Sequence, residues 1–225
     1  IARIRHLAAR HSRFPKFDVA AAFINTLSVQ LPNLLLPALF SPLIAGYYLF
    51  AERVLGTPLS LLAQSVGQVL YAQSRKAMEE QRLTAVTIRV LGGLFLLVVL
   101  PVVVMFFAGE TLFALIFGES WRMAGLFASW LMIGLGGQFL YSSVSLVLMA
   151  TNSQHINLAL HLCMLVAKSA ALLYGYLIGD ALSGIIAFAL MNLVGYLCGT
   201  IVVLWRARNC DLSDADRRHY AQAKN

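Results

Sequence analysis

Charge is scarce in this chain. Only 12% of its 225 residues are Asp, Glu, Lys or Arg, whereas 60% are hydrophobic and the mean hydropathy is +0.76. A soluble domain usually carries about 25% charged residues. Most of the surface is therefore unsuited to water, and the composition excludes an ordinary soluble protein.

Motifs for catalysis and for metal binding are missing as well. The sequence has no His-Glu-x-x-His, no Cys-x-x-Cys and no Gly-x-Ser-Gly, and its three cysteines have neither metal nor redox spacing. No apolar segment holds the paired aspartates of a phospholipid synthase. We therefore expect no enzyme activity, no cofactor and no metal site.

What the chain has instead is a series of long apolar runs. A run of about 20 apolar residues is long enough to cross a membrane as a helix. The predicted spans are 17–40, 42–73, 86–108, 122–149, 154–178 and 181–205. The predicted fold is an all-α membrane protein, a six-transmembrane-helix bundle over 17–205, preceded by a basic segment (1–16) and followed by a basic tail (206–225).

The connections between these spans are short. Ser41-Pro42 and Gly179-Asp180 are typical of tight turns, and residues 110–117 fit an amphipathic turn along the membrane interface. The pairs Gly175/Gly179 and Gly195/Gly199 predict close helix approach.

Basic residues mark one side of the predicted bundle. Of the 17 Lys and Arg residues, Arg53 and Lys168 lie inside spans, Arg122 lies on one set of flanks, and the rest lie on the other set. Cytoplasmic flanks are enriched in Lys and Arg, so we expect both termini in the cytoplasm. Because the chain starts at Ile1 within a basic segment, we also expect it to be a fragment of a longer protein.

Two groups of residues resemble a known family. The sequence that matches the seventh and eighth helices of O-antigen and exopolysaccharide flippases comprises Phe14-Pro15, Asn25, Gln30-Leu31-Pro32, Phe40-Ser41-Pro42, Ala45-Gly46-Tyr47-Tyr48, Arg53-Val54-Leu55, Pro58 and Gln68-Val69. Phe117-Gly118-Glu119-Ser120-Trp121, followed by Ala124-Gly125, is similar to the periplasmic element between helices nine and ten of that family. The chain thus resembles the C-terminal half of a polysaccharide flippase of the MOP superfamily.

This resemblance implies a function. A complete relative has two six-helix bundles around a central cavity and moves a lipid-linked saccharide across the bacterial inner membrane by alternating access. The implied partners are a polyprenyl-pyrophosphate-linked saccharide, the lipid bilayer and a missing N-terminal six-helix bundle, with no nucleic acid. Two alternatives stay open: a MATE-like or other multidrug or lipid exporter of the same superfamily, and a truncated remnant that transports nothing.

Charged residues inside spans are the first candidates for function, because burying them in a membrane is costly. Arg53 shares a predicted helix face with Ser60 and Gln64, and Lys168 shares one with His161. We expect these residues and Asn25 to line the substrate cavity, where Arg53 and Lys168 would attract phosphate or acidic sugars. Snorkelling or ion pairing is the structural alternative for both cations.

Further candidates follow from residue type. Glu52 is an ion-coupling candidate, with an ion pair between helices as its alternative. Pro32 and Pro58 interrupt helical hydrogen bonding and are hinge candidates. Several buried amides could contact sugar hydroxyls, although hydrogen bonding between helices is their commoner role: Gln30, Asn33, Gln138 and Asn192.

Overall fold

A computed structural model describes residues 13–151 and 153–222, and no β-strand occurs among them. Its elements are α2 (Arg13–Leu39), α3 (Pro42–Glu79), α4 (Leu83–Phe117), the 3-10 helix η1 (Glu119–Trp121), α5 (Arg122–Val144), α6 (Leu146–Ala150), α7 (Gln154–Ile178) and α8 (Ala181–Gln222). Most of the basic segment predicted at 1–16 lies outside the described residues. The prediction of an all-helical chain is confirmed.

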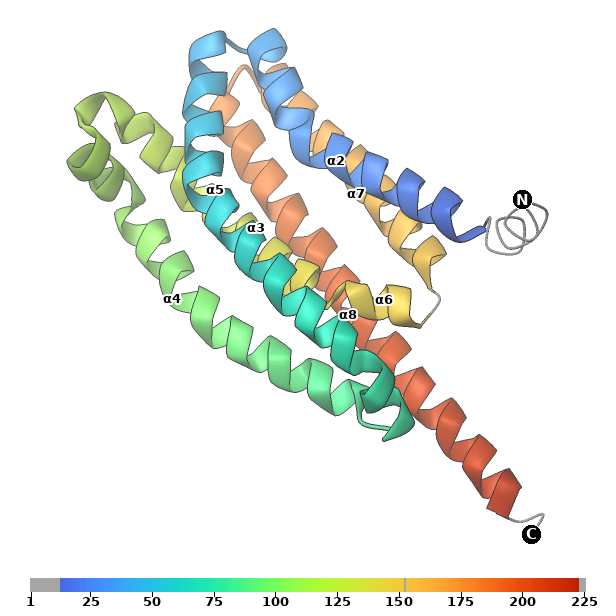
Figure 1. The fold of residues 1–225 in the computed structure, drawn as a ribbon. Helices are drawn as coiled ribbons and strands as arrows, with labels where there is room; N and C mark the ends of the chain where they lie inside the picture. Colours follow the sequence, from blue (N-terminus) through green and yellow to red (C-terminus); the bar gives the residue numbers. More distant parts are fainter. Residues whose placement is uncertain (1–12, 152, 223–225) are drawn as a thin grey trace, which may run out of the picture.

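The long helices run back and forth, so the connections alternate between two ends of the bundle (Figure 1). The α2–α3 turn, η1 and the α7–α8 turn lie at one end. The α3–α4 turn, the α6–α7 connection and the end of α8 lie at the other. The basic clusters at 75–89 and 206–208 therefore share one end of the molecule, as the sequence predicted.

Four segments are long and apolar enough to cross a membrane: Leu83–Phe117, Glu119–Ala150, His155–Ile178 and Ala181–Leu212. Phe23–Leu39 is a shorter apolar helix. Helix α3 is long but less apolar, because Glu52, Arg53 and several amides interrupt it. The structure thus supports an all-helical membrane protein with four candidate spans. The count of six membrane-spanning helices stays a prediction.

Turn chemistry sets two helix boundaries as expected. Ser41 caps α3 by accepting a hydrogen bond from the Ile44 amide at 3.2 Å, with Pro42 at the first helical position. Gly179 ends α7 with φ 79°, a left-handed conformation that favours glycine. Asp180 then accepts hydrogen bonds from the first turn of α8, and the Ser183 hydroxyl is the main group holding its pKa below the usual value.

Other boundaries differ from the prediction. The interfacial turn predicted at 110–117 is wrong, because α4 continues as a helix to Phe117, where the Phe113 ring packs 5.9 Å from that of Phe50. Helix α8 continues beyond 205 through most of the predicted tail. The predicted span 122–149 breaks at Ser145, whose hydroxyl bonds the Ser142 carbonyl, a contact that can bend a helix.

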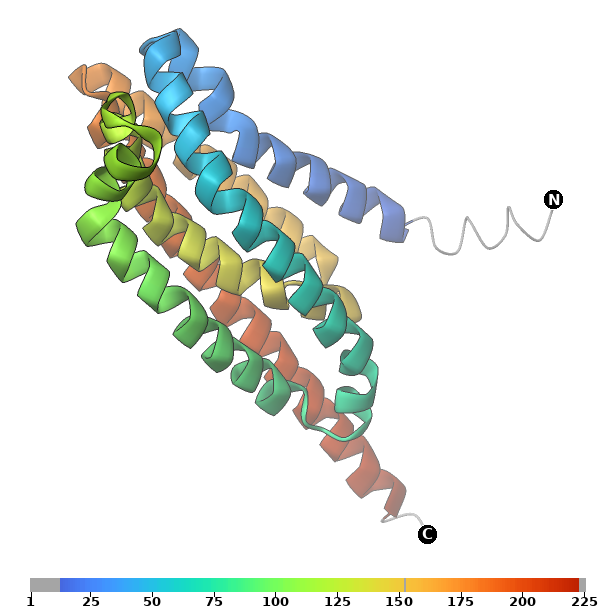
Figure 2. The same cartoon turned by 60° about the vertical axis from the view of Figure 1, so that its left-hand side comes forward.

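Helix α5 lies at the centre of the bundle. It packs against α3, α4 and α8, whereas α2 packs mainly against α7 (Figure 2). In the most apolar 18-residue stretch of the span Glu119–Ala150, which contains α5, 67% is buried, compared with 17% in the corresponding stretch of α4. Helix α4 therefore presents a broad apolar face suited to lipid. In both views α2 and α3 separate as they run from their shared turn.

Glycines allow α7 and α8 to approach each other closely. Gly175 of α7 faces Gly184 of α8, where a side chain on Gly175 would lie 2.4 Å from the Gly184 backbone. The predicted packing role is therefore supported for Gly175. Gly179 has open space around it and serves as the helix end instead.

The C-terminal part of α8 forms hydrogen bonds with the α3–α4 and α6–α7 connections, at the end of the bundle that carries the basic clusters. The Asp211 carboxylate accepts hydrogen bonds from the Leu83 and Thr84 amides at 3.1 and 3.0 Å, and from the Thr84 hydroxyl at 2.7 Å. Arg206 donates to the Ser153 hydroxyl at 2.7 Å. Helix α8 thus fixes the start of α4 and the start of α7.

We expect Asp211→Ala to destabilise the protein by about 1–2 kcal/mol, the usual cost of losing a helix N-terminal cap. No local side chain caps α4, since Arg82 at the cap position makes no such bond. Thermal unfolding in detergent measures the effect, with the exposed Arg208→Gln on the same helix as control. Equal melting temperatures for the two variants would contradict this role of Asp211.

Candidate functional site

Two adjoining cavities lie among α2, α3, α5, α6, α7 and α8. The smaller, of about 20 Å³, is lined by Val29, Tyr48, Glu52, Leu131, Leu135, Gln138, Lys168, Phe188 and Asn192. The larger, of about 460 Å³, extends along α3 between α2 and α5. Val29, Glu52, Leu135 and Gln138 line both, so the two cavities form one site.

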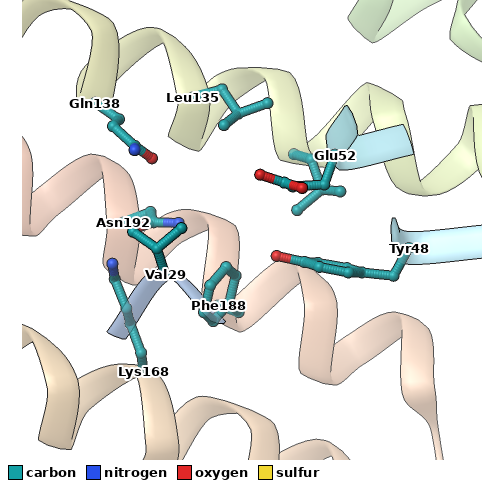
Figure 3. Close-up of a pocket in the computed structure, with 9 residues that line it drawn as sticks. Val29, Tyr48, Glu52, Leu135, Gln138, Lys168, Phe188 and Asn192 are labelled. Carbon is teal, nitrogen blue, oxygen red and sulfur yellow. The ribbon is translucent and has the colours of Figure 1, made fainter. Parts of the chain in front are cut away.

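Polar groups from four helices point into the smaller cavity (Figure 3). Glu52 and Tyr48 come from successive turns of α3, Gln138 from α5, Lys168 from α7 and Asn192 from α8. A carboxylate, a phenol, two amides and an ammonium group therefore meet in the interior of an apolar bundle. Such a combination is unusual in a structural core, because every buried polar group needs a partner.

Lys168 is the most unusual member of this group. Its side chain is only 1% exposed, and among the described residues no acidic side chain forms an ion pair with it. Its Nζ lies 5.0 Å from the Tyr196 ring centroid and 5.7 Å from that of Phe188, within the range of cation–π attraction. These contacts do not replace a counter-ion, and an unpaired buried charge costs several kcal/mol.

One wall of the larger cavity is a polar surface of α3, here called the polar wall. Thr57, Ser60, Gln64 and Gln68 are exposed residues of α3 that line it. Asn25 lines the cavity from α2, Ser142 from α5, and Ser145 from the position that follows α5. Hydroxyl and amide groups are both donors and acceptors, so this wall can bind hydroxyl-rich ligands.

The structure brings together most of the residues predicted for the site. Asn25, Ser60 and Gln64 line the larger cavity, Lys168 the smaller, and Glu52 both. Neither Arg53 nor His161 lines either cavity.

These two residues lie elsewhere for separate reasons. Arg53 follows Glu52 on α3 and points about 100° away from it, to an exposed position. His161 is buried two turns from Lys168 on α7, with its ring 6.1 Å from that of Tyr141. Within this bundle Arg53 and Lys168 therefore do not line a common cavity, and their shared role in a cavity between two bundles stays a prediction.

Sequence reasoning gave too little weight to Tyr48, Gln138 and Asn192. The two amides were assigned mainly to hydrogen bonds between helices, and Tyr48 was noted only as part of a motif. In the structure the Asn192 side chain is 5% exposed and its Oδ1 has no hydrogen-bond partner. Asn33 donates to Gln30 at 2.7 Å within α2, although its own Oδ1 is also buried without a partner.

The hinge candidates lie close to the site. Pro32 is buried inside α2 and Pro58 is exposed inside α3, and both helices continue through them. Pro58 lies between Thr57 and Leu59, which line the larger cavity. A bend at this position would change the shape of the cavity.

Comparison with known families gives one match. Residues 5–125 match the family model described as polysaccharide biosynthesis protein. The match covers α2, α3, α4 and the start of α5, and so includes Asn25, Glu52, Ser60 and Gln64 but not Lys168. No curated protein and no solved structure matches the chain.

Proposed function

The chain belongs to the family of polysaccharide biosynthesis proteins, and from this premise we propose that it is one half of a membrane transporter for a lipid-linked saccharide precursor. In this proposal it corresponds to the C-terminal bundle of a MOP-type flippase in the bacterial inner membrane, with both termini in the cytoplasm. Alternating access with an N-terminal bundle moves the substrate between leaflets.

The observation that carries this proposal is the buried, unpaired Lys168 beside a polar cavity of about 460 Å³ in an apolar helical bundle. Moving a saccharide across a membrane requires a wet path with hydrogen-bonding groups, because its hydroxyls cannot be left unpaired in hydrocarbon. Ser60, Gln64 and Asn25 provide such groups. Lys168 provides a positive charge for a phosphate or an acidic sugar.

Arg53, Pro32 and Pro58 have secondary roles in this proposal. Arg53 is exposed on the same helix as the polar wall, where it would meet substrate shared with the second bundle. The prolines allow α2 and α3 to bend between the two access states. His161 lines neither cavity and packs its ring 6.1 Å from that of Tyr141, so in this proposal it supports the helix that carries Lys168.

The positive charge of Lys168 favours transport of a lipid-linked saccharide over export of cationic drugs. A cationic drug would be repelled by Lys168, whereas an anionic lipid pyrophosphate would be attracted. A multidrug exporter of the MATE type is therefore disfavoured. A remnant without transport would have no use for a buried charge that costs stability.

The test is transport by the purified full-length protein in proteoliposomes. A fluorescent polyprenyl-pyrophosphate oligosaccharide is placed in one leaflet, and a membrane-impermeant quencher reports its movement to the other. A cationic dye serves as the competing substrate. We expect movement of the oligosaccharide and none of the dye. Dye movement would indicate the drug-exporter alternative, and movement of neither would indicate the remnant.

A further inference from the structure

Glu52 differs from the other residues that line both cavities because it is ionisable. It lines both the small cavity that holds Lys168 and the larger cavity beside α3. The other residues common to both cavities are Val29, Leu135 and Gln138, and none of these is ionisable. Among the described residues, Glu52 is thus the one titratable group that lines both the cavity of Lys168 and the larger cavity.

The small cavity can hold a bridging water. Its volume of about 20 Å³ exceeds the roughly 10–15 Å³ that one water molecule needs. The Asn192 Oδ1 atom is buried without a partner, and its side chain lines this cavity. A water accepting from Lys168 and donating to Asn192 and Glu52 would satisfy groups that the protein itself leaves unpaired.

We propose that Lys168 and Glu52 form a proton-exchange pair. An N–H bond of the Lys168 ammonium breaks as its proton passes to the water, and the water passes one of its own protons to the Glu52 carboxylate. The products are a neutral amine and a neutral carboxylic acid, so the total charge of the pair does not change. Glu52 then releases the proton into the larger cavity, and Lys168 regains a proton by the same route in reverse once alternating access has opened that cavity to the other side of the membrane.

The surroundings of the pair favour a proton over a metal cation. The ammonium group of Lys168 already places one positive charge in the cavity, which repels a second cation. The titratable groups facing the pair are Tyr48 from α3 and Tyr196 from α8, and α5 adds Tyr141 near His161 of α7. Residues 23–39 of α2 contain no titratable group, and among the described residues no three His, Cys, Asp or Glu side chains are grouped as a metal site would need.

This inference deepens the proposed function. It rests on that function only for what the proton movement drives, because the proton movement itself can be measured without any saccharide. The full-length protein is reconstituted in proteoliposomes that contain a pH-sensitive dye, and a pH gradient or a sodium gradient is imposed. We expect a proton flux that depends on the pH gradient and not on sodium. Glu52→Gln is expected to reduce this flux on the order of 100-fold, the lower range for a positioned proton-transfer group.

Lys168→Arg is the decisive variant. Arginine keeps the positive charge of lysine but does not release its proton at accessible pH, so it retains the electrostatics and removes the exchange. We expect the same loss of flux as for Glu52→Gln, with unchanged elution in size exclusion. Tyr174→Phe, an exposed ionisable position on the same helix, is the control and should leave the flux unchanged.

The outcomes separate the two proposals. Proton flux that is lost in Lys168→Arg supports the exchange pair, even if no saccharide moves in the transport assay. Full flux in Lys168→Arg, or a flux driven by sodium, overturns the pair while leaving saccharide transport intact.

Discussion

Gly125→Ala is expected to lower the stability of the protein by about 2–3 kcal/mol, within the usual cost of overpacking a well-packed core. Helices α4 and α5 touch here through their backbones. A methyl group on Gly125 would lie 2.5 Å from the Gly109 carbonyl oxygen and 2.7 Å from the Glu110 Cα. Backbone atoms cannot rotate away as the end of a side chain can, so the two helices must separate.

Gly93→Ala provides the matched control. Gly93 lies in the interior of α4 with nothing within 4 Å of its missing side chain. Here the same substitution should stabilise the helix by up to about 1 kcal/mol, because alanine has the higher helix propensity. Thermal unfolding in detergent measures both variants, with a shift of about 2–4 °C per kcal/mol. Similar melting temperatures would show that the α4–α5 contact is looser than described.

Lys168→Met is expected to change activity and stability in opposite directions. Removing a charge that binds substrate costs about 1.5–3 kcal/mol, so export in cells should fall about 10- to 100-fold. The same change replaces a buried cation that makes no direct ion pair by an apolar side chain of similar length, and Glu52 then keeps its proton and stays neutral. Stability should therefore rise, by about 1–3 kcal/mol.

Surface polysaccharide in intact cells measures export, and the melting temperature of the purified protein measures stability. Lys76→Met is the matched control, because Lys76 is 82% exposed and its ion pair with Glu80 is at the surface. It should affect neither property. A Lys168→Met protein that is both inactive and less stable would indicate a structural lysine rather than a functional one.

The sequence predicts helix boundaries well where neighbouring residues determine the turn. Ser41-Pro42 caps α3, and Gly179-Asp180 ends α7 and begins α8, because the residues that form each turn are neighbours in the chain. Apolar length predicts the helices themselves. The segment 110–117 was misjudged because its leucines and phenylalanines suit an interfacial turn as well as a longer helix. The structure has the longer helix, in which Phe113 packs against Phe50.

The site was predicted in part, because its members come from different helices. Periodicity placed Ser60 and Gln64 on one face of α3, and both line the larger cavity. Periodicity within α3 does not show which of the adjacent residues Glu52 and Arg53 faces the other helices. The contact of Gly109 with Gly125 is likewise invisible in the sequence, since it depends on how α4 and α5 cross.

If α3 lines a path for a saccharide, its polar wall must border water at membrane depth, and labelling of single cysteines measures this. Gln64 and Leu96 lie at similar depths, about 20 Å along α3 and α4 from the α3–α4 turn. In a protein whose three native cysteines are replaced, Gln64→Cys and Leu96→Cys are treated with a membrane-impermeant maleimide. We predict that Gln64→Cys reacts and that Leu96→Cys, 72% exposed on the apolar face of α4, does not. If Gln64→Cys were as unreactive as Leu96→Cys, α3 would face lipid or packed protein, and the wet path would not exist.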